Sequence, residues 1–235
     1  MLPLLDQSTE QLQAWLAERG WPRYRAGQIR RWVFRRRAAQ FEQMSDLPRP
    51  LRTSLACAFS IWTAQVVAHQ AADDGTEKLL LELADQERIE CVLLRDDKQH
   101  RTACISSQVG CAMRCAFCAS GLDGVARNLL SREILEQLLQ LGQLLGAHER
   151  LTHVVVMGMG EPLNNLDQLL PALNIAARRD GFGISARRIT ISTVGIPKGI
   201  RRLADMDCQY HPVSYTHLRA HETPEHLVCR LLLEK

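Results

Sequence analysis

One stretch decides the fold of this chain: Thr102-Ala-Cys-Ile-Ser-Ser-Gln-Val-Gly-Cys-Ala-Met-Arg-Cys-Ala-Phe-Cys118. Residues 102–107 predict a strand, and three cysteines follow in the pattern C-x3-C-x2-C, at Cys111, Cys115 and Cys118. Thiolates at this spacing can converge on one metal centre, because so short a loop turns back on itself. Three cysteines are one fewer than an iron–sulfur cluster usually has, and a cluster held by three leaves one iron open to another ligand.

A zinc site is the main alternative for these cysteines. It would need a fourth Cys or His nearby, and the next histidine, His148, is 30 residues beyond Cys118. Four of the eight cysteines fall within residues 104–118, which argues for metal binding or catalysis rather than a disulfide framework. Chance placement of three structural cysteines at this spacing is a weaker alternative.

Strand and helix patterns alternate on the C-terminal side of the triad. A helix is predicted over residues 131–145, capped by Ser131, then a strand over 152–157 whose valines are expected to be buried on both sides. A second helix (169–177) and strand (188–192) follow. Such units imply a parallel sheet or barrel with functional sites at the carboxyl ends of the strands. Before the triad, residues 79–83 and 89–94 predict a β-hairpin.

The N-terminal region reads as a small helical domain. Ser8 and Gln11 form a capping-box pattern for a first helix, and a third helix is predicted around residues 51–57. The second helix has an apolar side, and its arginines are expected to face water: Arg30, Arg31, Arg35, Arg36 and Arg37. Two interpretations stay open for it, a structural cap and a platform for RNA phosphates.

Bulk properties set the outer limits. The chain has 235 residues, of which 46% are hydrophobic, so it can bury a core. Its net charge is +3: residues 1–56 carry +5, from ten arginines against five acidic residues, and the remainder carries −2. The sequence shows neither a run of eighteen apolar residues nor a signal pattern, which predicts a soluble, cytosolic protein without a membrane segment.

The residues around the triad resemble the RlmN/Cfr family of radical-SAM rRNA methyltransferases, over about residues 5–211. Six motifs carry the resemblance in order: Trp21-Pro-Arg-Tyr-Arg-Ala-Gly-Gln-Ile29, Met44-Ser-Asp-Leu-Pro48, Cys104-Ile-Ser-Ser-Gln-Val-Gly-Cys111, Gly121 with Arg127-Asn128-Leu129, Met157-Gly-Met-Gly-Glu161-Pro162 and Ile191-Ser192-Thr193. The resemblance implies a [4Fe-4S] cluster on the triad and S-adenosyl-L-methionine (SAM) on the open iron, whose cleavage gives a 5′-deoxyadenosyl radical.

The resemblance also implies roles for single residues around the cofactors. Phe117 stands where the superfamily usually has an aromatic residue. Gly160 and Glu161 are expected to contact SAM. The glycine would let the backbone approach the cofactor closely, and the carboxylate would accept from the SAM ammonium. Ser192 is expected to supply another hydrogen bond to SAM. From the residues alone, Ser192 reads equally as an ordinary hydroxyl at a strand end.

Two further residues are implied as catalytic. Glu90 matches the family's proposed proton acceptor, and Cys104 matches the cysteine that resolves an RNA–protein crosslink through a disulfide with a methyl-carrying cysteine. Without the family, Glu90 reads as an outward-facing strand residue and Cys104 as an inert buried thiol.

The expected fold is therefore α/β: a partial (β/α) radical-SAM barrel, truncated, preceded by a small helical domain and a β-hairpin. The expected division is residues 1–60 as an RNA-binding accessory domain, 75–96 as the hairpin linker and 97–211 as the N-terminal half of the core. Residues 212–235 depart from the family and resemble a translated sequencing adapter, so they are expected to be an artefact. The methyl-carrying cysteine is then missing, and the chain as written is expected to be inactive.

Three functions remain open at this point. The first is methylation of carbon 2 of an adenine in 23S rRNA, with tRNA as a further substrate and carbon 8 as the alternative position. The second is a radical-SAM enzyme of another substrate class, and the third is a zinc-stabilised RNA-binding module without catalysis. For the first, the resemblance implies an electron donor such as flavodoxin and a monomeric enzyme.

Overall fold

The computed structural model describes residues 1–115, 118–206 and 209–214, and it opens with the helical region that the sequence predicts. Its helices are α1 (Thr9–Glu18), α2 (Arg25–Phe34) and α3 (Arg49–Ala58). The capping box is confirmed: the hydroxyl of Ser8 accepts from the Gln11 amide at 3.1 Å, and the Ser8 amide donates to Gln11 Oε1 at 2.7 Å. Helices α1–α3 bury their leucine and isoleucine faces against one another. Two short strands, β1 (Leu2–Pro3) and β2 (Phe59–Ser60), pair in parallel beside them.

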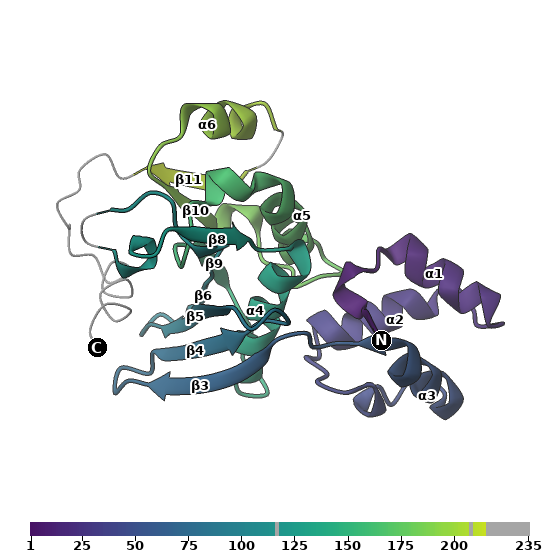
Figure 1. Cartoon of the computed structure of the whole chain (residues 1–235). Coiled ribbons are helices and arrows are strands. Elements are labelled where there is room, and N and C mark those ends of the chain that lie inside the picture. The colour runs from purple at the N-terminus through teal and green to yellow at the C-terminus, as the bar shows by residue number, and fades with distance from the viewer. Residues whose placement is uncertain (116–117, 207–208, 215–235) are drawn as a thin grey trace.

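A seven-stranded sheet is the main element after the helical region (Figure 1). Its order is β11-β10-β9-β6-β5-β4-β3. The strands are β3 (Gln65–Ala71), β4 (Glu77–Glu82), β5 (Arg88–Arg95), β6 (Arg101–Cys104), β9 (His153–Val156), β10 (Ile189–Thr193) and β11 (His211–Ser214). Strands β6, β9, β10 and β11 are parallel, as strand–helix units require, whereas β3, β4 and β5 join antiparallel. The predicted hairpin, β4–β5, is confirmed, and it is continuous with the core sheet.

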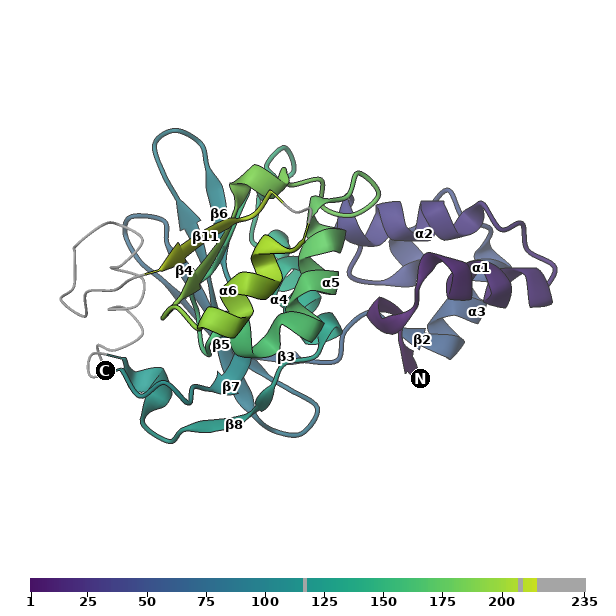
Figure 2. The same ribbon diagram turned by 90° about the horizontal axis from the view of Figure 1, so that it is seen from above.

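Helices cover one face of this sheet. Helices α4 (Ser131–Gln143) and α5 (Leu166–Ala177) lie between the sheet and the N-terminal helices (Figure 2), and α6 (Pro197–Ala204) follows β10. Alternate residues of the strands, such as Leu93, Ala103 and Val154, pack with α4 and α5 in one buried core. The sequence places Ser131 at the cap of α4, but Ser131 is its first helical residue and Leu130 occupies the cap position. No helix in the described ranges has both the length and the apolar character needed to cross a bilayer.

The opposite face of the sheet is only partly covered. Val154 and Val156 of β9 are fully buried towards the helices, but Val155 points to the other face and is half-buried there. The prediction that the valine run is buried on both sides is therefore wrong for Val155. Val155 instead packs with Val92 and Cys104 in a small separate cluster.

The arginines of α2 and the residues after it correct a second prediction, because several hold the helical region to the core instead of facing water. Arg37 donates to the carbonyls of Gly142, Leu145 and Gly146 at the end of α4, at 2.6–3.0 Å. Arg30 is 9% exposed and lies 3.8 Å from Asp180, and burial lowers its pKa. Two other arginines lie at the surface. Arg35 donates to the Arg179 carbonyl at 2.9 Å, and Arg31 is exposed.

The linker between the two regions is anchored by a buried carboxylate. Glu136 of α4 is fully buried and accepts from the Thr63 amide at 2.8 Å, the Thr63 hydroxyl at 2.6 Å and the Ala64 amide at 2.8 Å. Burial raises the pKa of Glu136, although these hydrogen bonds act in the opposite direction. One side chain of the core thus fixes the backbone that enters β3.

Candidate functional site

The cysteine triad lies on a loop closed at its neck. Strands β7 (Gln108–Gly110) and β8 (Val125–Asn128) pair as a short antiparallel stem, and the loop of residues 111–124 joins them. The Cys111 amide donates to the Gly124 carbonyl at 2.7 Å. A Cβ on Gly110 would lie 2.1 Å from that carbonyl oxygen, and Gly110 has a φ of 72°, so the close approach at the neck requires glycine there.

The three thiols lie within electrostatic reach of one another. Cys111 is buried, Cys115 and Cys118 are half-buried, and all three are free thiols. Burial raises the pKa of Cys111, and the charges of Cys118, Cys115 and Glu161 raise it further. The pKa of Cys115 is raised by burial, by Cys118 and by Glu161. A bound cation would relieve this cost, because it favours the thiolate form.

The triad's donor chemistry fits an iron–sulfur cluster: three free thiols on one short loop, in surroundings that penalise uncompensated negative charge. Among the described residues, however, no three His, Cys, Asp or Glu side chains are already placed around a common metal position. Phe117, the expected aromatic residue of this loop, lies outside the described residues.

The glycines after β9 pack directly on the segment that leads to the triad. The Gly158 amide donates to the Ile105 carbonyl at 3.0 Å, and the Met159 amide donates to Ser106 Oγ at 2.8 Å. Gly160 has a φ of 98°, and a Cβ there would lie 2.5 Å from Gln108 Cβ. The structure thus gives Gly160 a requirement that the sequence does not reveal, namely close contact between two segments of the protein itself.

Glu161 joins the carboxyl ends of β9 and β10. It is 2% exposed, and its carboxylate accepts from the Thr193 hydroxyl at 2.6 Å, the Leu163 amide at 3.0 Å and the Val194 amide at 3.0 Å. A carboxylate offers about four lone-pair positions, so these donors leave room for one more. The residue of β10 that touches Glu161 is Thr193, the neighbour of the predicted Ser192.

Strand register brings three of the expected site residues to one face of the sheet. Cys104 of β6 pairs with Val92 of β5, so Glu90, two residues before Val92, points to the same face. Cys104 also pairs with Val155 of β9, which pairs with Thr190 of β10, two residues before Ser192. Glu90, Cys104 and Ser192 therefore share the face opposite α4 and α5.

Glu90 and Cys104 differ in their surroundings. Glu90 is half-buried, and its Oε1 lies 3.2 Å from Lys78 Nζ on the neighbouring strand. Cys104 is 2% exposed. On the helix side of β5, burial raises the pKa of Cys91, and the charges of Cys104 and Glu90 add to the effect. Both expected catalytic groups thus lie within electrostatic reach of one residue of β5.

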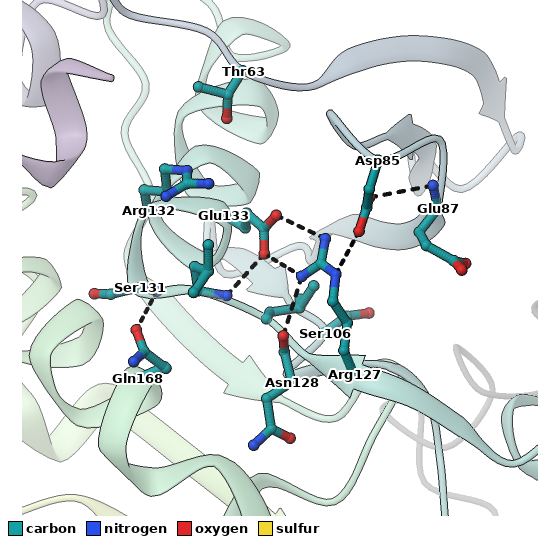
Figure 3. Close-up of polar contacts among 12 residues, drawn as sticks. Thr63, Asp85, Glu87, Ser106, Arg127, Asn128, Ser131, Arg132, Glu133 and Gln168 are labelled. Atoms are coloured by element: carbon teal, nitrogen blue, oxygen red, sulfur yellow. Dashed lines mark hydrogen bonds and ion pairs between the residues drawn. The ribbon is translucent and has the colours of Figure 1, made fainter. Parts of the chain in front are cut away.

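A charged network at the base of the cysteine loop was missed at the sequence level (Figure 3). Arg127 of β8 donates to both carboxylate oxygens of Glu133 at 2.8 and 2.9 Å and to Asp85 Oδ2 at 2.6 Å. Glu133 also accepts from the Leu130 amide at 2.8 Å, which caps α4. The only signal in the sequence is an acidic residue in the first turn of a predicted helix, which is too common to reveal a partner.

Comparison with known proteins covers both parts of this architecture. Residues 2–61 match the family described as "Ribosomal RNA large subunit methyltransferase N-terminal domain", and residues 105–217 match the "Radical SAM superfamily". A protein of Rhodopirellula baltica named "Probable dual-specificity RNA methyltransferase RlmN" is 54% identical over 225 residues, or 96% of this chain. The chain belongs to the RlmN family of radical SAM proteins. Membership of the superfamily implies a [4Fe-4S] cluster and SAM as cofactors.

Other relatives agree in sequence and in structure. A Moorella thermoacetica protein with the same name is 48% identical over 86% of this chain. The crystal structure of a radical SAM methyltransferase from Sphaerobacter thermophilus is 37% identical and superposes with a TM-score of 0.83, covering 90% of this chain and 62% of its own. The chain spans 60% of the length of the Rhodopirellula protein and 58% of the Moorella protein.

Proposed function

We propose that this chain carries the cofactor-binding elements of an RNA methyltransferase that acts on carbon 2 of an adenine in 23S rRNA and in tRNA. The observation that carries the proposal is the cysteine loop: three free thiols on one closed loop, with Glu161 near enough for its charge to raise the pKa of two of them. The names of the relatives, which specify dual-specificity RNA methyltransferases, support RNA as the substrate.

Cys111, Cys115 and Cys118 would hold the cluster, and the cluster would supply one electron to SAM. Glu161 would accept from the SAM ammonium with its remaining lone-pair position, while its three present donors keep the carboxylate oriented. Ser192, which shares a face of the sheet with Glu90 and Cys104, would add a hydrogen bond. Phe117, on the cysteine loop, would line the same site.

Glu90 and Cys104 would act on the substrate. Glu90 would take the proton from carbon 2, and its ion pair with Lys78 would hold the carboxylate in place. The Cys104 thiolate would attack the sulfur that links RNA to the family's methyl-carrying cysteine. The disulfide forms as the bond from that sulfur to the methylene carbon breaks, and this carbon keeps the electron pair, takes up a proton and becomes the methyl group of the product. The sequence of this chain offers no cysteine in the context of that methyl-carrying residue, so these steps need the family's C-terminal segment. An electron donor such as flavodoxin and a monomeric, cytoplasmic enzyme complete the proposal.

Cluster loading tests the proposal directly. Anaerobic reconstitution with iron and sulfide should give about four of each per chain. Cys111→Ala, Cys115→Ala and Cys118→Ala should each abolish loading, whereas Cys57→Ala, which removes an exposed thiol on α3, should leave it unchanged. Stoichiometric zinc without sulfide would instead support the zinc-stabilised RNA-binding module and reject radical chemistry.

The substrate is tested with a chimera that joins residues 1–206 of this chain to the C-terminal segment of the Rhodopirellula relative. Mass spectrometry of digested 23S rRNA and tRNA should find 2-methyladenosine. In the Cys104→Ala chimera, a covalent RNA–protein species should accumulate on denaturing gels, because no thiolate remains to attack the linking sulfur. Loading of the cluster without any methylated adenosine would favour a radical-SAM enzyme of another substrate class.

A further inference from the structure

The stem of the cysteine loop is attached to the protein on two sides. On one side, Gln108 donates to Asn128 Oδ1 at 2.7 Å across the stem, and Gln108 Oε1 accepts from the Glu161 amide at 2.8 Å. On the other side, Arg127 reaches Glu133 and Asp85. Neighbouring residues of a strand point in opposite directions, so Arg127 and Asn128 secure opposite faces of the stem.

The contacts of Arg127 join three elements that are distant in sequence. Glu133 lies in the first turn of α4, Asp85 lies in the turn between β4 and β5, and Arg127 lies three residues after the neck of the loop, at Gly124 (Figure 3). The two nitrogens on Glu133 form a bidentate pair, which fixes direction as well as distance. Glu133 is 4% exposed and Arg127 is 29% exposed, so water competes little for the pair.

Two contacts connect this region to the β4–β5 hairpin. The Ser106 hydroxyl, just before β7, donates to the Glu90 carbonyl at 2.6 Å, and Arg127 in β8 holds Asp85 in the outer turn. Strand β5 carries Glu90. The turn between β4 and β5 is otherwise held by contacts within the hairpin; for example, the Glu87 amide donates to Asp85 Oδ1 at 3.3 Å. A guanidinium suits this position because one planar group serves two carboxylates in different directions. A lysine ammonium offers no such fork.

We propose that Arg127 is a positioning residue: it holds the cysteine loop at one location relative to the start of α4 and the β4–β5 hairpin, and so to Glu90. The relevance to catalysis rests on the proposed function. The positioning itself can be measured on the chain alone, through the loop's thiols and backbone amides.

The test compares Arg127→Met with Arg132→Met. Arg132 is a matched control, since it lies five residues on, is 24% exposed and forms an ion pair with Asp6 at 2.9 Å, but it contacts the N-terminal region and not the loop. Two measurements are made under native conditions: alkylation of Cys111, which is buried at the neck, and hydrogen exchange of residues 83–88 and 108–111. Urea unfolding of each variant reports its global stability.

Arg127→Met should speed Cys111 alkylation and exchange in both segments by about tenfold, equivalent to about 1.4 kcal/mol of local opening. Arg132→Met should leave both rates within about twofold of those of the unmodified chain. Its urea midpoint should nevertheless fall about as much as that of Arg127→Met. Arg127→Lys should be intermediate, and Asp85→Asn should speed exchange in residues 83–88. Asp85 is 43% exposed, so its variant keeps the test valid if Arg127→Met does not fold.

Equal effects of Arg127→Met and Arg132→Met would overturn the proposal, because they would mean that Arg127 acts only through global stability. Unchanged exchange in Asp85→Asn would overturn the link to the hairpin. Failure of the unmodified chain to bind iron and sulfide would count against the proposed function and would leave the alkylation and exchange results standing. The two ideas can therefore fail separately.

Discussion

Replacing Arg37 with methionine should destabilise the protein without changing its affinity for RNA. Arg37 donates three charge-assisted hydrogen bonds to carbonyls at the end of α4, of which two are partly buried and one is exposed. Hydrogen bonds to charged groups contribute about 1.5–3 kcal/mol each when they are buried. Because these three hydrogen bonds are only partly buried or exposed, water can replace part of their stabilising contribution. The favourable position of a cation at a helix C-terminus adds about 0.3–1 kcal/mol. We therefore expect a loss of about 2–3 kcal/mol.

The assay is urea unfolding, with Arg36→Met as the matched control. Arg36 is exposed, stacks on Trp32 at 4.3 Å and lies 3.9 Å from Asp46, so its loss should cost no more than about 1 kcal/mol. RNA affinity is measured in parallel at two salt concentrations. If Arg37→Met unfolded at the wild-type urea concentration but bound RNA more weakly, Arg37 would be a phosphate contact, and its assignment to the domain junction would be refuted.

Three further outcomes are expected. Burial raises the pKa of Glu136, so its stabilising contribution is full below the unfolded pKa of 4.5 and is lost as pH rises through the folded pKa. Glu136→Gln should therefore flatten the dependence of Tm on pH above 4.5. Parallel curves of Tm against pH for the variant and the unmodified chain would contradict this. Gly160→Ala should lower Tm, because a φ of 98° strains any side chain and the new Cβ would lie 2.5 Å from a carbon of β7. Gly27→Ala is the control: a Cβ at this position of α2 has nothing within 4 Å, so the variant should raise Tm slightly. Replacing Arg31 and Arg36 with glutamine should reduce the slope of log Kd for RNA against log salt by about 1.5, and an unchanged slope would exclude them from the phosphate contacts.

Elements with strong periodicity were predictable from the sequence, and elements held by tertiary contact were not. Helices α1 to α5 and strands β4, β5, β6, β9 and β10 all follow from apolar spacing and turn residues. Strand β3 was missed because all seven of its residues are exposed, so it shows no alternation of buried and solvent-facing side chains. Strands β7 and β8 are too short for a pattern, and they exist because the neck of the cysteine loop closes between them.

Charge was the least reliable guide. Five arginines in and after α2 suggest a solvated face, yet Arg30 and Arg37 serve the junction with the core. The sequence cannot distinguish these from Arg31, because their partners are backbone carbonyls and a carboxylate more than a hundred residues away. Within the site, the triad was evident from spacing alone. The contact between Thr193 and Glu161 depends on how two strands align, which no local pattern encodes.

Glu90, Cys104 and Ser192 share one face of the sheet, and side chains alternate between faces along a strand. The site is therefore sensitive to whether an odd or an even number of residues is inserted into or deleted from a strand. Deleting one residue between Glu90 and Val92 would leave β5 paired but would turn the Glu90 carboxylate toward the leucines under α4, where an unpaired charge is costly. Deleting two residues would restore its direction and shift it by one repeat along the strand. In a library of insertions and deletions within β5, we therefore expect even-numbered changes to survive selection for folding more often than odd-numbered ones, a bias that side-chain replacement alone would never reveal.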